Sequence, residues 1–207
     1  EQYVGSEFNS TMYNGDYSFG KDLFSYYGLD DLIISGDTIS QTNLIRRRWL
    51  DNHFYGIVYS LEYSEDQFQL ILGGGANQYL GAHYGEVIWA QYSSNGNIRH
   101  RYYDNDATKN DVNFYAKFNY DISSNFSTYL DLQNRFIIYD FVGLDQNGSD
   151  LNQTANLSFF NPKAGFNFIV NTNSSVYGFA GIGNKEPSRD DFTESTPNDR
   201  PKHESLL

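Results

Sequence analysis

The chain has 207 residues, no cysteine, and 26 acidic against 14 basic residues, which gives a formal net charge of −12. The absence of cysteine excludes disulfides and thiolate metal sites, and the acidic excess argues against nucleic acid as a partner, since nucleic-acid binding needs clustered Lys and Arg. Aromatic residues make up 17% of the chain and glycines number 18, which favours strands and turns over helices. No run of about 18 apolar residues occurs, so no transmembrane helix is predicted.

Residues 1–44 are polar and broken by Gly, Asn and Asp. They are predicted to be mostly loop, with one short hairpin at the turn dipeptide Asn14-Gly15. Order is expected from about Ile45. Residues 53–64 alternate between two faces and return as 67–75 after a tight turn at Glu65-Asp66. A long loop is predicted from 77 to 110.

Residues 111–121, DVNFYAKFNYD, form the clearest strand, with an apolar and a polar face. The turn 123–125 leads to a strand at 126–139, and a loop at 143–152 leads to the next. That strand, 153–160, is predicted to break at Asn161-Pro162 and continue through 170. After the turn 171–174 a strand follows at 175–183, and residues 185 onward are predicted to form a loop.

The predicted connections alternate between short turns and long loops. A soluble sandwich has no reason to place all its short turns at one end, whereas a membrane barrel turns tightly on the periplasmic side and carries long loops outside. The predicted fold class is therefore all-β: an antiparallel meander of hairpins from a transmembrane β-barrel, incomplete, with about six to seven strands. Alternation predicts a lumen-facing set, Glu62, Lys117, Asp131 and Arg135. It also predicts a lipid-facing band on the other face: Tyr55, Ile57, Phe68, Leu70, Phe114, Phe118, Leu130, Phe166 and Phe168.

Several segments, in this order, resemble a known family. They are Tyr27–Asp30, Arg46–Gly56, the Phe-Asn-Pro-Lys step at Phe160–Lys163, the Val-Tyr pair at 176–177, and Glu186–Thr193. Together they resemble the TonB-dependent receptors of Bacteroidetes-type bacteria. The resemblance implies a location in the cell outer membrane and a plugged barrel. It also implies import of a bound nutrient (an iron chelate, a vitamin or a glycan) with energy from the inner-membrane TonB complex.

On this resemblance, residues 1–207 correspond to part of the receptor barrel, with 1–44 mostly extracellular loop and no plug domain. The expected partners are outer-membrane lipid, a small-molecule or oligosaccharide ligand, and the TonB complex, which would be contacted through a segment missing from these residues. Nucleic acid is not an expected partner.

The predicted loop 77–110 is aromatic and mixed in charge, which favours a role in ligand capture. Its candidate contact residues are Trp89, Tyr92, Arg99, Arg101, Tyr102 and Tyr103. No Gly-x-Ser-x-Gly elbow occurs, and nothing brings two carboxylates to the spacing of a glycosidase, so the chain is not expected to be an enzyme. Asp104-Asn105-Asp106 with Asp111 hints at calcium but lacks the glycine and glutamate of an EF-hand, and no cofactor or metal is predicted.

One alternative remains from another functional class, a soluble secreted β-sandwich that binds carbohydrate through aromatic loops. It predicts a chain that folds alone in water as a monomer. A closed two-sheet core built from the aromatic faces would contradict the barrel interpretation.

Overall fold

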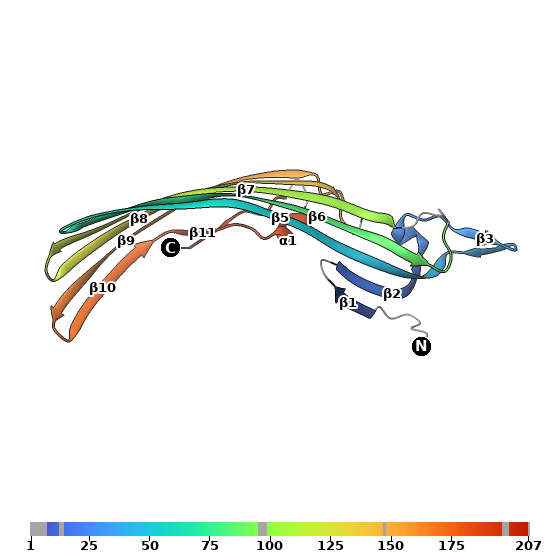
Figure 1. Cartoon of the computed structure of the whole chain (residues 1–207), viewed down its shortest axis with the longest axis horizontal. Coiled ribbons are helices and arrows are strands. Elements are labelled where there is room, and N and C mark those ends of the chain that lie inside the picture. The colour runs from blue at the N-terminus through green and yellow to red at the C-terminus, as the bar shows by residue number, and fades with distance from the viewer. Residues whose placement is uncertain (1–7, 13–14, 95–98, 147, 196–198, 207) are drawn as a thin grey trace. The chain divides into compact units, whose positions relative to one another are not determined.

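The computed structural model describes residues 8–12, 15–94, 99–146, 148–195 and 199–206 (Figure 1). The chain divides into two compact units, each made of several segments. Unit 1 comprises Glu1–His53, Leu80–Thr108 and Asp140–Gln153, and unit 2 comprises Phe54–Tyr79, Lys109–Tyr139 and Thr154–Leu207.

Almost all regular structure in the described residues is β. The strands are β1 (Phe8–Met12), β2 (Gly15–Leu23), β3 (Leu32–Ile34), β4 (Asp37–Ile39), β5 (Gln41–Glu65), β6 (Phe68–Ala90), β7 (His100–Ser123), β8 (Phe126–Leu144), β9 (Gln153–Asn171), β10 (Ser174–Gly181), β11 (Gly183–Lys185) and β12 (Glu204–Leu206). A 3₁₀ turn, η1 (Phe24–Tyr27), and one short helix, α1 (Arg189–Thr193), complete the elements. No helix in this part of the chain is long and apolar enough to cross a membrane.

The main sheet has eight strands in the order β1-β2-β5-β6-β7-β8-β9-β10 (Figure 1). Chain neighbours pair in it as an antiparallel meander, interrupted only where the small β3-β4 hairpin is inserted between β2 and β5. The prediction of an antiparallel meander of hairpins is confirmed. In the described residues the sheet has two edges, β1 and β10, and does not close into a barrel.

The predicted alternation of turn lengths is confirmed. Two residues each join β5 to β6, β7 to β8 and β9 to β10, within one residue of the predicted turns. Asp66 adopts a left-handed φ of 41° in the first of these turns, a conformation that Asp and Asn tolerate better than most residues. At the opposite ends of these strands the connections are longer, residues 91–99 and 145–152.

The predicted loop 77–110 is wrong, because β6 continues to Ala90 and β7 begins at His100. The pattern fails there because the segment has no clean apolar face, while strand pairing depends on backbone hydrogen bonds that any side chain permits. Gly85 shows the local reason: a Cβ at this position would lie 2.4 Å from the rings of Tyr102 and Tyr103. Gly85 therefore weakens the strand pattern in the sequence, and its missing side chain lets these two rings lie against β6.

The predicted break at Asn161-Pro162 is also wrong, since β9 runs without interruption from Gln153 to Asn171. Proline lacks only the backbone donor. The Pro162 carbonyl still accepts a hydrogen bond from the Ile182 backbone N–H at 2.9 Å. The strand therefore tolerates the proline.

Residues 1–44 hold more strand than predicted. The hairpin at Asn14-Gly15 is confirmed by the β1-β2 pairing, in which Met12 faces Gly15, although residues 13 and 14 lie outside the described residues. Strand β2 then pairs with the first part of β5, ending with Gly15 opposite Trp49. Beyond Trp49 the outer edge of β5 has no partner strand in the part of the chain that is described.

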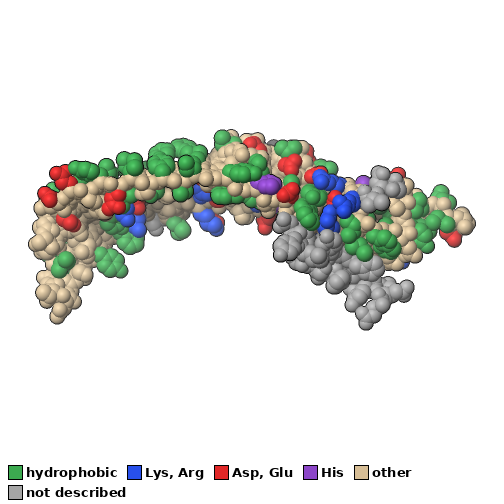
Figure 2. Space-filling model, viewed as in Figure 1, with side chains coloured by type: hydrophobic (Ala, Val, Ile, Leu, Met, Phe, Trp, Pro, Cys, Tyr) green, Lys and Arg blue, Asp and Glu red, His purple; other side chains and the backbone are tan. Residues whose placement is uncertain are grey.

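Unit 2 has one apolar and one polar sheet face, as the alternation predicts. Aromatic rings meet across the apolar face, for example Phe68 and Phe118 with centroids 4.7 Å apart. The face is nevertheless open: Ile57 is 70% exposed and Leu61 is 67% exposed. In Figure 2, hydrophobic side chains lie along the upper surface of these strands, and Lys and Arg side chains lie below them beside further hydrophobic ones. No second large sheet covers the apolar face in the described residues, so the closed core of a sandwich is not found there.

Unit 1 has a buried cluster beside the start of β5. It contains Phe24, Tyr27, Leu29, Leu44 and Val87. The η1 turn that supplies two of these side chains ends at Gly28, whose left-handed φ of 62° closes the turn.

Candidate functional site

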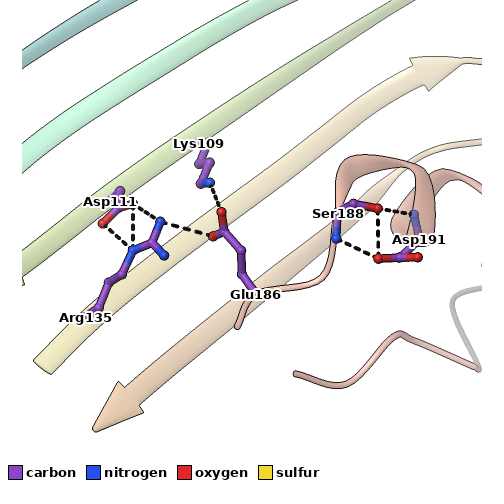
Figure 3. Close-up of polar contacts among 6 residues, drawn as sticks. All are labelled: Lys109, Asp111, Arg135, Glu186, Ser188 and Asp191. Atoms are coloured by element: carbon purple, nitrogen blue, oxygen red, sulfur yellow. Dashed lines mark hydrogen bonds and ion pairs between the residues drawn. The ribbon is translucent and has the colours of Figure 1, made fainter. Parts of the chain in front are cut away.

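An ion-pair network lies on the polar face of unit 2 (Figure 3). Arg135 on β8 donates to Asp111 on β7, from Nε at 3.0 Å and from Nη2 at 2.6 Å. Glu186, which follows β11, accepts from Lys109 Nζ at 2.6 Å and lies 3.4 Å from Arg135 Nη2. Because Asp111 is only 5% exposed, its charge requires this compensation. The network ties the tail of the chain to two strands.

The segment after Glu186 is held by a capping box and a buried ring. Ser188 Oγ accepts from the Asp191 backbone N–H at 3.3 Å, and the Asp191 carboxylate accepts from the Ser188 backbone N–H at 2.7 Å. The Ser188 hydroxyl also donates to the Asp191 carboxylate at 2.8 Å. This hydrogen bond and that from the Ser188 backbone N–H lower the pKa of Asp191. Phe192, 1% exposed, packs edge-on against Tyr139 with centroids 5.7 Å apart.

A second anchor fixes the other end of this segment. Asn184 donates to the carbonyl of Phe160 at 3.0 Å and to Asn161 Oδ1 at 2.9 Å. Its own Oδ1 accepts from Ser205, in the strand that pairs with β11. The tail predicted as an open loop from residue 185 is therefore folded, with the helix α1 and the β11–β12 strand pair. We call its described residues, 183–195 and 199–206, the strap.

Between this strap and the sheet lies an open cavity of about 870 Å³. Five basic side chains line it: Lys109, Arg135, Lys185, Arg189 and Lys202. Three acidic side chains also line it: Glu186, Asp191 and Glu204. Basic groups thus outnumber acidic ones here, the reverse of the whole chain.

The polar face carries a second feature close to the short turns. Glu62 accepts from Gln69 at 2.6 Å, and Gln69 in turn accepts from Asn119 at 2.6 Å. Nearby, the Lys163 ammonium lies 4.9 Å from the centre of the Phe179 ring and 6.0 Å from that of Tyr129. A cavity of about 520 Å³ opens among amide, hydroxyl and aromatic groups here.

The four predicted lumen residues share the polar face. Glu62 and Arg135 are placed there by the contacts above. Lys117 is two residues from Asn119, and Asp131 is two residues from Tyr129, so each has the same orientation as its neighbour. Whether this face borders a lumen remains a prediction.

The predicted ligand-contact residues are not gathered in one loop. Trp89, 49% exposed, lies near the end of β6, and Tyr92 and Arg99 lie in the nine-residue connection. The Tyr92 backbone N–H donates to Thr42 Oγ1 at 2.9 Å, and Arg99 has a left-handed φ of 61°. Their contact with a ligand stays a prediction.

Arg101, Tyr102 and Tyr103 lie in β7 instead. Tyr102 packs edge-on against Tyr27, with centroids 4.7 Å apart, and Tyr103 is only 9% exposed. The two tyrosines therefore contribute to the packing of unit 1. Arg101 is held by Asp104 at 2.6 Å.

Arg101 takes part in a row of aromatic and basic side chains that the sequence did not indicate. Its guanidinium lies 3.8 Å from the centre of the Tyr84 ring, which stacks on Trp49 at 6.5 Å. Arg47 lies 4.5 Å from the Trp49 ring and donates to the buried carboxylate of Glu86. Because these residues come from three different strands, no local pattern reveals the row.

The network in Figure 3 was likewise only partly visible in the sequence. Arg135 was predicted to lie on the polar face, but its partner Asp111 was considered only as a possible calcium ligand. Asp111 instead accepts from Arg135, and the described residues contain no cluster of three His, Cys, Asp or Glu side chains suited to a metal. Glu186 belongs to a segment that carries the family resemblance, but nothing in the sequence linked it to this network, because its partners lie far away along the chain.

Comparison with models of known protein families and with curated proteins finds no match.

Proposed function

We propose that this chain forms part of the barrel wall of an outer-membrane TonB-dependent receptor, which binds and imports a nutrient. The observation that carries the proposal is the open apolar face of unit 2, opposite a charged face on the same strands. A water-soluble protein rarely leaves so large an apolar surface uncovered. Lipid on one side and a watery lumen on the other would match both faces.

Strand length supports the same function. A tilted β-strand crosses a bilayer with about 9–11 residues. The part of β5 in unit 2, Phe54–Glu65, is at least that long. The strands also extend well beyond this part, into unit 1. In a receptor, such extensions would carry the strands past the membrane surface on the side opposite the two-residue turns.

The open edges of the sheet define what the proposal requires. Lipid does not tolerate unpaired backbone groups, so β5 and β10 would each pair with further strands of the receptor. The plug and the contact with the TonB complex would also lie outside the described sheet. The nutrient would be an iron chelate, a vitamin or a glycan.

Lipid contact can be tested with tryptophan reporters in a bilayer. The 207-residue chain would be reconstituted with lipids brominated on the acyl chains, which quench nearby tryptophan fluorescence. Ile57→Trp on the apolar face should be strongly quenched, and the matched variant Lys117→Trp on the polar face should not. The unsubstituted chain corrects for its two native tryptophans.

Equal quenching of the two reporters, or none at either, would contradict the proposal. A monomer in detergent-free gel filtration would favour the soluble carbohydrate-binding alternative instead. The aromatic and basic row of unit 1 would then be the surface to test with oligosaccharides.

A further inference from the structure

The cavity under the strap concentrates positive charge in an acidic protein. Of the 14 Lys and Arg residues in the chain, five line this one cavity, against three acidic residues. A cleft whose lining carries an excess of one sign of charge attracts ions of the opposite sign. We infer that this cavity binds a small organic molecule that carries two or more oxyanion groups, such as carboxylates or phosphates.

The basic side chains of the cavity have two separate roles. Lys109 and Arg135 are engaged with Glu186 at 2.6 and 3.4 Å, so they hold the strap and shape the floor. Lys185 and Lys202 are exposed at the rim. Lys185 lies 3.6 Å from Glu204, and both side chains are more than two-thirds exposed. An exposed pair of this kind contributes little, so an incoming anion can displace Glu204 at low cost.

Two of the three acidic side chains of the lining already have partners within the protein. Glu186 faces two cations of the sheet. The Asp191 carboxylate accepts hydrogen bonds from the side chain and the backbone N–H of Ser188. Both carboxylates therefore accept hydrogen bonds within the protein, and the exposed Asp191 also interacts with the charge of Lys185.

Size and rigidity fit a small ligand. Ligand pockets commonly measure about 300–1,000 Å³, and this one measures about 870 Å³. Two prolines, Pro187 and Pro201, are part of the lining, and the strap is anchored by the capping box and by Asn184. A preformed cavity loses less free energy on binding. Lysine binds carboxylate and phosphate alike as a point charge.

The inference stands on these residues and does not require that the strands cross a membrane. If the transport function also holds, the imported nutrient would be an anion. Binding is therefore measured on the 207-residue chain in a non-ionic detergent, with no transport step.

Isothermal titration calorimetry with citrate and with pyrophosphate tests the inference, with the neutral sugar raffinose as a control. At least one anion should bind, raffinose should not, and affinity should fall as salt rises from about 0.01 to 0.15 M because screening increases. Preference for citrate over pyrophosphate, or the reverse, identifies the oxyanion.

Lys185→Gln combined with Lys202→Gln should weaken anion binding about tenfold or more, which corresponds to about 1.4 kcal/mol. Arg at both positions should retain binding, which excludes a folding defect as the cause. Lys117→Gln removes one positive charge from the polar face outside the cavity and should leave affinity within about twofold.

Three results would overturn the inference: no binding of either anion, an unchanged dissociation constant in the double Gln variant, or an equal loss in Lys117→Gln. None of them bears on lipid contact, which the tryptophan reporters measure separately.

Discussion

The Asp111–Arg135 pair gives the sharpest test of how the polar face contributes to stability. In a double-mutant cycle, Asp111→Asn and Arg135→Gln are made singly and together, and the coupling free energy of unfolding is obtained from the four proteins. Both substitutions remove charge and nearly preserve shape.

The magnitude follows from the geometry. The Asp111 side chain is 7% exposed and Arg135 is 31% exposed. Charge-assisted hydrogen bonds contribute about 1.5–3 kcal/mol, and removing one partner of a fully buried pair costs about 3–5 kcal/mol. Arg135 retains water contact and lies 3.4 Å from Glu186, which reduces the loss. We therefore expect a coupling of about 2 kcal/mol.

The assay is urea unfolding of the chain in detergent, followed by far-ultraviolet circular dichroism. The same cycle on the exposed pair Lys185–Glu204, with atoms 3.6 Å apart, serves as the matched control and should give at most about 0.5 kcal/mol. Similar coupling in both pairs would refute the argument that burial of Asp111 determines the strength of its interaction.

Three further outcomes are expected. Phe192→Ala should loosen the strap by about 3–5 kcal/mol, seen as faster amide exchange there, while Phe160→Ala, at a half-exposed ring, should not. The pKa of Asp191 is below its ordinary 3.8, so its stabilisation of α1 is complete above that pH and is lost as pH falls below it. Exchange in α1 should therefore rise in acid, and Asp191→Asn should remove this pH dependence. Gly143→Ala should destabilise by about 1–3 kcal/mol, since φ is +109° and the new Cβ would lie 2.3 Å from a backbone oxygen. Gly183→Ala, with open space around it, should be nearly neutral; urea unfolding measures both variants.

The turns and the two faces of unit 2 could be predicted because both are local. A two-residue turn at residues 172 and 173 needs only Asn and similar residues between two alternating runs. The period of two places Lys117 and Phe118 on opposite faces without any knowledge of partners. These signals are strongest where one face must stay apolar.

The rest depends on contacts between distant segments. The end of β6 lacks a clean alternation because Gly85 leaves room for the Tyr102 and Tyr103 rings of β7. Strand pairing there depends on backbone hydrogen bonds and needs no side-chain pattern. Glu186 reaches Lys109 across 77 positions of the chain, so no local motif could reveal the network. Tyr102 and Tyr103 were predicted to contact a ligand because the sequence placed them in a loop. Aromatic residues suit both ligand binding and packing, and in β7 these two pack.

The outer edge of β5 has a practical consequence for any laboratory sample. From Leu50 to Glu65 the strand contains no Lys, Arg or Pro, and between Asp51 and Glu62 it carries no carboxylate; charged residues, Lys above all, and Pro commonly protect an exposed edge. A second copy of the chain can therefore add its own strand there through backbone hydrogen bonds alone. Self-association should thus increase with protein concentration even when the detergent covers every apolar side chain. Such samples should bind amyloid dyes before they precipitate.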